Sequence, residues 1–424
     1  MRPALLACAL LLTAQDDAPN GDYGGFWTWP EIQSRLDALE KAHPDILRRS
    51  SLGKTCEGRD IPLLKISDNP ADDEDEPEVL LMAGIHPREQ QPQISIMNLV
   101  AELLEQYGKD PRITKLVQER EIWIIPILNV DGKVHDMKHG NGMDRGAGWR
   151  KNRRKNPDGT YGVDLNRNFP VRWGGSTDEE KSEVYEGPTP LSEPETQALT
   201  KFFDERPLRA FVDLHSTMKA ILHPSYLTGA ERDRYAKLTS GMRLAQKDPY
   251  RVTEPDADAD PPPRRPGNTG LSNAWAYGTR GVFSIIFEVA GKGFYAPPAD
   301  IQREYEANVR GPLLNLLEAC AELPLPGKGS AALKGGRLKG KLAPGTTNSW
   351  TPEVEGSCDY GILVSESAHL QVTSEFRLLP AKDGYHFQVL KEAKPGEHFP
   401  LVLYLWDRDR GRSVARFTLV MEPP

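Results

Sequence analysis

The sequence predicts an α/β domain with a mixed, mostly parallel central sheet flanked by helices, followed by a smaller all-β sandwich. Between residues 79 and 289, short apolar runs rich in β-branched residues alternate with segments of helical period. That order is typical of a sheet covered by helices. After Pro324 the composition shifts toward Gly, Pro and Lys, and only short β-rich runs follow, which is the pattern of a β-sandwich.

The first residues have the features of a signal peptide. Residues 1–15 contain one Arg, then an apolar run, then small residues, in the order that secretory signals use. The alternative is a mildly apolar chain terminus. We expect residues 1–20 to be a signal peptide and short leader, and the protein to be exported, either secreted or periplasmic. No other run reaches the roughly 18–20 apolar residues that a membrane span requires.

Length, charge and cysteine content set outer limits. The 424 residues suffice for one large core and a smaller second one. Asp and Glu number 61 against 53 Lys and Arg, for a formal net charge of -8, which argues against nucleic acid as a partner. After signal cleavage, Cys56, Cys320 and Cys358 would allow at most one disulfide and lack zinc-finger spacing. The oligomeric state is not determined by the sequence.

The elements of the first domain follow from local periodicity. A helix is predicted near its start, where Ile32, Leu36 and Leu39 share one face, and a second over 92–108, with Pro92 in its first turn. Pro126 predicts a bulge or an early end of its strand. His135 and His139 are assigned to a polar loop, and the acidic residues 68–78 to a solvated loop. Buried strands are predicted over residues 61–67, 79–85, 121–130, 209–216 and 282–289.

The C-terminal part is predicted to begin after a linker. Residues 324–340 are rich in Gly, Pro and Lys, as flexible linkers are. Residues 341–424 are predicted to form the β-sandwich accessory domain, with a role in stabilising the first domain or in binding a surface. Its β-rich runs cover residues 360–365, 368–379, 385–390, 399–406 and 414–421.

Ionisable side chains stand at or near the ends of three predicted strands. They are His86, His215 and Glu288. Sites in open α/β sheets form where strands end and loops begin, so we expect these side chains to converge. His86 and Glu89 lie three residues apart after Gly84, which permits a sharp turn.

A catalytic zinc needs three protein ligands and one open position. His86 and Glu89 are candidates for two of them, and His215 is the best candidate for the third. Asp213 stands two residues before His215, on the same side of the pleat. The alternative for His215 is a core histidine bonded to the backbone, and the alternative for residues 86–89 is an ordinary charged turn.

Glu288 stands in an almost wholly apolar strand. A buried carboxylate is costly unless it is paired or functional. One interpretation is a structural ion pair. The other is a general base beside a metal, where a carboxylate accepts the proton of an attacking water.

Arginines are concentrated in a stretch rich in Gly and Asn, residues 148–170. Guanidinium groups bind carboxylates through two parallel hydrogen bonds, and they also stabilise a developing oxyanion. Next to a hydrolytic zinc they suggest a substrate that ends in a free carboxylate. The alternative is a basic surface loop. The arginines are Arg150, Arg153, Arg154 and Arg167.

Taken together, six ordered motifs resemble those of the zinc metallocarboxypeptidases of the carboxypeptidase A and T type. The resemblance covers about residues 22–322 and implies a carboxypeptidase-like fold, with residues 21–323 as the catalytic domain. The motifs are HPRE at 86–89, WRKNR at 149–153, GVDLNRNF at 162–169, YEGPTPLSEPET at 185–196, HS at 215–216 and FEV at 287–289.

The resemblance implies a role for each matching residue. It implies one Zn²⁺ per chain held by His86, Glu89 and His215, a ligand set already known for a carboxypeptidase. Glu288 would be the general base, and Arg150 would polarise the scissile carbonyl and stabilise the oxyanion. The substrate-binding residues would be Asn166 and Arg167 at the terminal carboxylate, Arg88 further along the peptide, and Asn273 at the floor of the specificity pocket.

The chain also departs from the family pattern. Counting back from Glu288, Pro266 occupies the place of the mobile tyrosine that usually closes over the substrate, so the resemblance assigns no residue to substrate closure. Neither Asn273 nor Tyr226 is acidic, which argues against a preference for C-terminal Lys or Arg. The first predicted helix of the catalytic domain follows the leader almost at once, so we expect no long inhibitory propeptide.

Three functions are compatible with these observations. The first is an exported zinc exopeptidase that removes C-terminal residues from peptides or proteins. The second is a zinc amidohydrolase acting on cell-wall stem peptides or acylated amino acids. The third, suggested by the missing tyrosine, is a peptide-binding protein that contains zinc without useful turnover.

Overall fold

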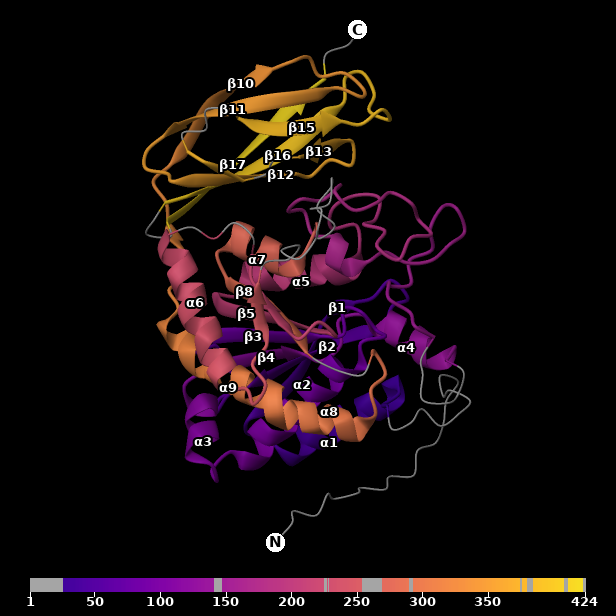
Figure 1. Ribbon diagram of the computed structural model, residues 1–424, viewed down its shortest axis with the longest axis vertical. Coiled ribbons are helices and arrows are strands. Elements are labelled where there is room, and N and C mark those ends of the chain that lie inside the picture. Colours follow the sequence, from indigo (N-terminus) through magenta and orange to yellow (C-terminus); the bar gives the residue numbers. More distant parts are fainter. Residues whose placement is uncertain are drawn as a thin grey trace.

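A computed structural model describes residues 26–140, 147–224, 227, 229–253, 269–289, 293–373, 376–379, 384–407 and 411–421. The predicted signal peptide, Tyr226 and Pro266 lie outside these residues. Figure 1 shows a central sheet covered by helices, with a separate set of strands stacked beyond α5 and α7. Within the described residues, no helix is long and apolar enough to cross a membrane.

Within the described residues, the central sheet has eight strands in the order β1-β2-β4-β3-β5-β8-β6-β7. The inner strands β4, β3, β5 and β8 run parallel, whereas β1, β2 and β6 pair antiparallel with their neighbours. The predicted mixed sheet is therefore confirmed. The strands are β1 Leu47–Lys54, β2 Asp60–Ile66, β3 Glu78–Ala83, β4 Glu121–Ile125, β5 Leu208–Ser216, β6 Ala220–Leu222, β7 Arg251–Thr253 and β8 Phe283–Val289.

Helices cover both faces of this sheet, with α5 and α7 on one side and α1, α2 and α3 on the other in Figure 1. Helix α1 buries Ile32 and Leu36 as predicted, and α2 begins at Gln90, so that Pro92 lies in its first turn. Strand β4 ends directly before Pro126, which is the early end predicted. The helices are α1 Trp29–Ala42, α2 Gln90–Gln106, α3 Pro111–Gln118, α4 Val130–Lys138, α5 Pro194–Glu205, α6 Gly229–Leu244, α7 Ser272–Arg280, α8 Pro298–Glu304 and α9 Arg310–Ala319.

The prediction of a polar loop around His135 and His139 is wrong. His135 lies inside α4 and His139 caps its C-terminal end. The helix starts at this point because the side-chain oxygen of Asn129 accepts the backbone N–H of Gly132 at 2.9 Å, which satisfies a donor that the first helical turn leaves unpaired.

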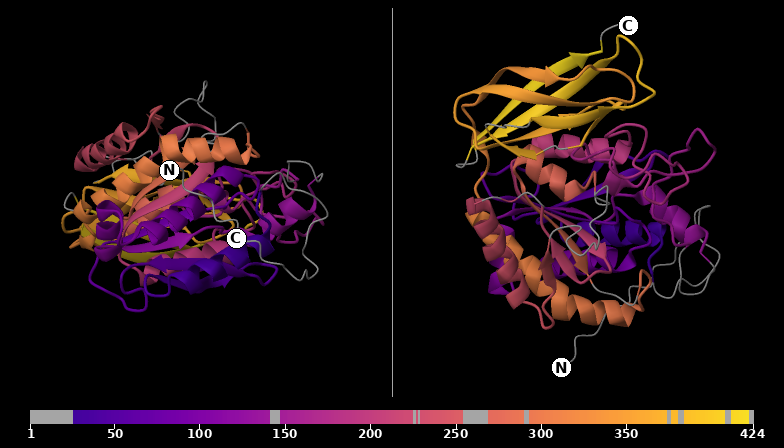
Figure 2. Two further views of the ribbon diagram at one scale, coloured as in Figure 1. Left: turned by 90° about the horizontal axis from the view of Figure 1, so that it is seen from below. Right: turned by 45° about the horizontal axis from the view of Figure 1, so that its top comes forward.

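The C-terminal strands form two sheets, stacked as layers in Figure 2. Their orders are β10-β11-β15-β13 and β14-β12-β16-β17-β9, and Trp350, Phe387 and Phe399 lie in the core between them. The run predicted over 368–379 is divided between β13 and β14. The strands are β9 Gly327–Lys328, β10 Ala332–Lys339, β11 Thr347–Glu355, β12 Tyr360–Ser365, β13 Leu370–Val372, β14 Phe376–Leu378, β15 Tyr385–Val389, β16 His398–Trp406 and β17 Gly411–Val420.

The predicted linker over 324–340 is wrong in its second half. Residues Ala332–Lys339 form β10 and pair antiparallel with β11. The glycines there serve close packing, because a Cβ atom on Gly336 would lie 2.2 Å from the ring of Trp350. A composition rich in glycine therefore does not distinguish a flexible linker from a strand whose glycines make room for a tryptophan ring. The division into a catalytic domain and an accessory domain stays a prediction.

The C-terminal strands pack directly on α7. Tyr360, Ile362 and Trp406 belong to the same hydrophobic core as the central sheet and its helices. The Trp406 Nε1 group donates to the carbonyl oxygen of Gly278 at 3.0 Å. Cys56, Cys320 and Cys358 are free, so no disulfide links these three residues.

Candidate metal centre and active site

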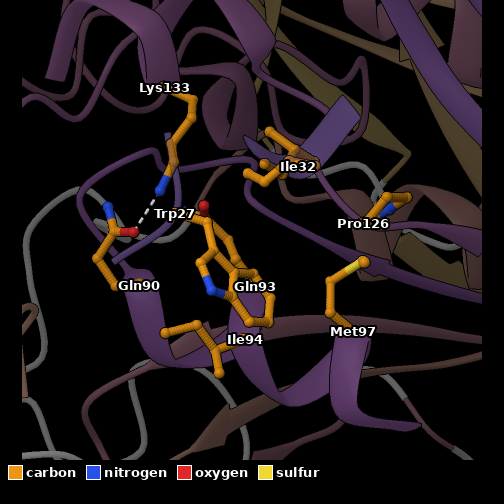
Figure 3. Close-up of a pocket in the computed structure, with 9 residues that line it drawn as sticks. Trp27, Ile32, Gln90, Gln93, Ile94, Met97, Pro126 and Lys133 are labelled. Atoms are coloured by element: carbon orange, nitrogen blue, oxygen red, sulfur yellow. Dashed lines mark hydrogen bonds between the residues drawn. The ribbon is translucent and has the colours of Figure 1, made fainter. Parts of the chain in front are cut away.

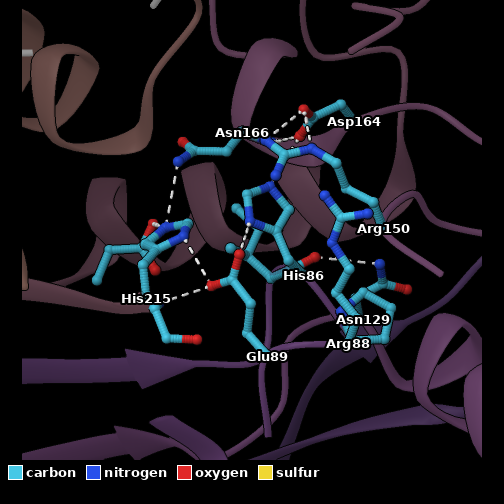
Figure 4. Close-up of polar contacts among 12 residues, drawn as sticks. His86, Arg88, Glu89, Asn129, Arg150, Asp164, Asn166 and His215 are labelled. Atoms are coloured by element: carbon cyan, nitrogen blue, oxygen red, sulfur yellow. Dashed lines mark hydrogen bonds and ion pairs between the residues drawn. The ribbon is translucent and has the colours of Figure 1, made fainter. Parts of the chain in front are cut away.

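His86, Glu89 and His215 gather at one point above the sheet (Figure 4). His86 follows β3 after a turn at Gly84, whose φ of +67° and close approach to Ile127 exclude a larger residue. Glu89 directly precedes α2, and His215 lies near the end of β5. One ligand atom from each of the three lies within 4.8 Å of the others.

The two imidazole rings are oriented as metal ligands usually are. His86 Nδ1 is 3.0 Å from Glu89 Oε1, and its Nε2 is 3.0 Å from Asp164 Oδ1. His215 Nδ1 is 3.3 Å from Glu89 Oε2, and its Nε2 is 3.1 Å from Asp213 Oδ2. Metal-bound histidines typically donate their second N–H to a carboxylate, which fixes the tautomer. Each Nδ1 atom can thus present a lone pair toward the shared point.

This donor set fits zinc. Two imidazole nitrogens and one carboxylate are ligands that catalytic zinc takes, and all three residues are buried. Burial acts to raise the pKa of Glu89, but His86 and His215 overcome this and hold that pKa below its usual range. The backbone N–H of Ser216 also donates to Glu89 Oε2 at 2.9 Å.

Glu288 lies beside His215, since the two residues are partners in the register of β5 and β8. Burial raises the pKa of Glu288 to about 7, although His215 acts in the opposite direction. Its Oε2 atom is buried without a hydrogen-bond partner in the described part of the chain. The described residues also offer it no Lys or Arg at ion-pair distance, so the structural ion pair considered above is not observed there.

Arg150 and His86 share one carboxylate, that of Asp164. Asp164 Oδ2 accepts from Arg150 Nε at 2.9 Å and pairs with Nη2 at 2.8 Å, while Oδ1 faces His86. Burial alone would raise the pKa of Asp164, but Arg150 and His86 hold it well below its usual range. Sequence reasoning assigned no role to Asp164. The available signal was an acid directly before the Leu-Asn-Arg segment in an apolar-flanked motif.

Asn166 and Arg167 are presented by a short 3₁₀ helix, Leu165–Arg167. Asp164 Oδ1 also accepts the backbone N–H of Asn166 at 3.0 Å and so starts this turn. Asn166 Nδ2 is 3.2 Å from His215 Nε2, and its Oδ1 accepts the backbone N–H of Ser272 at 2.9 Å. Asn166 therefore links the metal cluster to the start of α7, and Arg167 stands next to it, buried.

The two remaining predicted residues, Asn273 and Arg88, lie outside the metal cluster. Asn273 is fully buried in α7, where its side chain bonds to backbone groups of Leu222 and Ala274. Arg88 turns toward the surface: its Nη1 lies 2.9 Å from Glu183 Oε2, and its guanidinium stacks over Phe294. The structure thus groups the three metal-cluster residues with Glu288, Arg150 and Asn166 more tightly than with Arg88.

Comparison with known proteins gives the family. A model described as zinc carboxypeptidase matches residues 32–311 of the 424. The chain belongs to the zinc carboxypeptidase family. Membership implies a Zn²⁺ cofactor, in agreement with the donor set described above.

Individual members of the zinc carboxypeptidase family match parts of the chain. A zinc carboxypeptidase of Saccharothrix mutabilis subsp. capreolus is 40% identical over 158 residues, which are 37% of this chain and 35% of the relative. Mast cell carboxypeptidase A of Rattus norvegicus is 33% identical over 215 residues, 50% of each chain. The chain thus spans about a third to a half of the length of these curated relatives.

Solved structures of zinc carboxypeptidases share the fold. Bovine thrombin-activatable fibrinolysis inhibitor, in complex with tick carboxypeptidase inhibitor, superposes with a TM-score of 0.61 at 24% identity, covering 71% of this chain and 99% of that chain. Carboxypeptidase A from Helicoverpa armigera gives a TM-score of 0.61 at 23% identity, covering 71% and 75%. At this identity the likeness concerns the fold alone, and it agrees with the carboxypeptidase-like sheet predicted.

Proposed function

We propose that the protein is a zinc-dependent exopeptidase that hydrolyses the C-terminal peptide bond of peptides or proteins. One observation carries the proposal. Beside the cluster of His86, Glu89 and His215 lies Glu288 on the adjacent strand, whose carboxylate has one oxygen without a partner among the described residues. The guanidinium of Arg150 is held near the cluster through a shared acid, Asp164. This set contains a metal site, a base and an oxyanion donor.

Zinc would be held by His86, Glu89 and His215. When bound, it supplies Lewis-acid polarisation of a carbonyl and lowers the pKa of water. Glu288, whose pKa burial raises to about 7, accepts the proton of the attacking water and passes it to the leaving amine. Arg150 donates to the oxygen on which negative charge develops.

The remaining residues would select the end of a peptide. Arg167 and Asn166 bind the terminal carboxylate, because guanidinium and amide N–H groups match its two oxygens. Arg88, near the surface, contacts the peptide further from its end. Asn273 carries no charge, so we propose a preference for C-terminal residues other than Lys and Arg.

The decisive experiment compares peptide pairs that differ only at the C-terminus. The zinc-loaded protein should release the last residue from peptides with a free carboxylate and fail on the same peptides with an amide. Equal rates on both would refute the exopeptidase. Faster cleavage of cell-wall stem peptides than of ordinary peptides would favour the amidohydrolase, and tight binding without cleavage would favour the peptide-binding protein.

We also propose export of the protein, supported by the order of charged, apolar and small residues at its start. The N-terminal sequence of protein recovered outside the cytoplasm should begin near residue 21. Recovery only inside the cytoplasm with residues 1–20 intact would contradict export.

A further inference from the structure

Arg150 lies in a segment without regular secondary structure, and this segment is hydrogen-bonded to a buried acid in α4, Asp136. The backbone N–H of Trp149 donates to Asp136 Oδ1 at 2.8 Å, and the N–H of Ala147 donates to the Asp136 carbonyl oxygen at 2.8 Å. The N–H of Gly148 donates to the hydroxyl of Tyr295 at 2.9 Å. Asp136 therefore contacts the chain immediately before Arg150 at two points.

The same carboxylate also holds the segment that follows the strand of Glu288. The Tyr295 hydroxyl is 2.7 Å from Asp136 Oδ1 and 2.9 Å from Oδ2, and it can donate to one of them. Tyr295 stands seven residues after Glu288 in the sequence. Asp136 thus joins the segment of the oxyanion donor to the segment of the base.

A third connection reaches the metal loop. Gln90, the neighbour of Glu89, approaches Asp136 Oδ2 with its Nε2 at 3.5 Å and donates to the Pro87 carbonyl oxygen at 2.9 Å. Lys133 donates to Gln90 Oε1, as Figure 3 shows beside a small cavity between α1 and α2. Lys133 thus bonds to the amide that approaches Asp136, and within the described residues it forms no ion pair with Asp136 itself.

Burying a carboxylate is costly even when it accepts hydrogen bonds, unless a cation is paired with it. Asp136 is fully buried, and the described residues place no Lys or Arg at ion-pair distance from it. An apolar residue would remove this cost but would leave the Trp149 N–H and the Tyr295 hydroxyl without their acceptor. The Asp136 carboxylate is therefore a shared hydrogen-bond acceptor for three segments, those of Trp149, Tyr295 and Gln90.

We propose that Asp136 is a positioning residue for hydrolysis, which sets the place of Arg150 relative to the metal loop and Glu288. The inference rests on the proposed function, because that function assigns Arg150 its role. Asp136 acts through the backbone of residues 147–149 and does not touch the substrate.

The test is a double-mutant cycle of Asp136→Ala with Arg150→Ala on a peptide with a free C-terminus. Alone, Asp136→Ala should lower kcat by about 10- to 100-fold with little change in KM, as displaced catalytic groups do. In the Arg150→Ala background it should have little further effect on kcat, because coupled residues are not additive. Asp136→Asn retains an acceptor oxygen for Trp149 and should restore most of the activity.

A second readout does not depend on turnover. Amide hydrogen exchange in residues 147–149 should accelerate in Asp136→Ala, with or without zinc. The matched control is Asp131→Asn, a buried acid of the same helix that bonds to Thr55, Glu57 and Arg59 instead. It should leave exchange in residues 147–149 unchanged.

The outcomes separate the two proposals. An equal loss of kcat from Asp136→Ala in both backgrounds, or unchanged exchange in residues 147–149, overturns the positioning role and leaves the exopeptidase intact. If exchange accelerates in Asp136→Ala but the wild-type protein cleaves no peptide, the structural contact is supported and the proposed function is overturned. If Asp136→Ala does not fold, Tyr295→Phe carries the same comparison, because it removes the acceptor of the Gly148 N–H and a donor to Asp136.

Discussion

Replacing Asp164 by Asn should weaken zinc binding and slow turnover together. Asp164 is fully buried and uses both oxygens: one faces His86 at 3.0 Å and accepts from Asn166, and the other accepts from Arg150 at 2.9 Å. Asn keeps the size but has one oxygen and one NH₂ group. One of these sets of contacts must then place donor against donor, and the Arg150 charge loses its partner.

The magnitude follows from the two roles of the carboxylate. Loss of an acid that orients a ligating histidine lowers metal affinity by about 10- to 100-fold, or about 1.4–2.8 kcal/mol. Breaking a buried ion pair by removing one partner costs about 3–5 kcal/mol, and the remaining oxygen of the new side chain recovers part of that cost by accepting a hydrogen bond. The ion-pair cost should lower the melting temperature both with and without zinc, and weaker zinc binding should lower it further when zinc is present.

The assay combines a zinc titration against a chelator with kcat at saturating zinc. The matched control is Asp213→Asn, since Asp213 contacts His215 at 3.1 Å and Ser272 but not Arg150. Both variants should bind zinc more weakly, and only Asp164→Asn should remain slow when zinc is saturating. Wild-type zinc affinity in Asp164→Asn, or the same kcat in both variants, would refute this reasoning.

Three further predictions concern other parts of the molecule. Glu288→Gln should keep its zinc and lower kcat by about 10²- to 10⁴-fold; a variant with wild-type turnover would remove Glu288 from the role of base. Trp406→Ala should lower the unfolding free energy by about 3–5 kcal/mol in urea, because this ring joins the C-terminal strands to α7; a loss below about 1 kcal/mol would contradict that role. Burial raises the pKa of Glu186 to about 7, so the folded state keeps a proton that the unfolded state releases above about pH 4.5. This contribution to stability is present below about pH 4.5 and lost as the pH rises to about 7, and Glu186→Gln should show a smaller decrease over that interval; an identical pH profile would count against it.

Much of the sheet could be predicted because strand signals are local. The runs predicted over 79–85, 209–216 and 282–289 are apolar and short, and each forms a strand within one or two residues of the prediction. The error at residues 324–340 has the opposite cause. Gly336 is needed for a contact with Trp350, fourteen residues away, and composition alone cannot distinguish that from flexibility.

The metal cluster was accessible to sequence reasoning for a similar reason. His86 and Glu89 are three residues apart, and parallel strands bring their C-terminal ends to one edge of a sheet, so His215 and Glu288 could be expected nearby. The acids behind the ligands could not all be found in this way. Asp164 faces His86 across 78 residues of chain, and no pattern within either segment records the contact.

By itself, therefore, the sequence determined five strands of the central sheet (β2, β3, β4, β5 and β8), the helices α1 and α2, the family motifs and the candidate ligands, because each depends on residues close together in the chain. Only the tertiary structure decided which acids orient His86, what Arg150 pairs with, that Asp136 holds three segments together, and that the C-terminal strands share a core with α7. Those features are contacts between distant segments, and they exist only once burial has brought their hydrogen-bonding groups together.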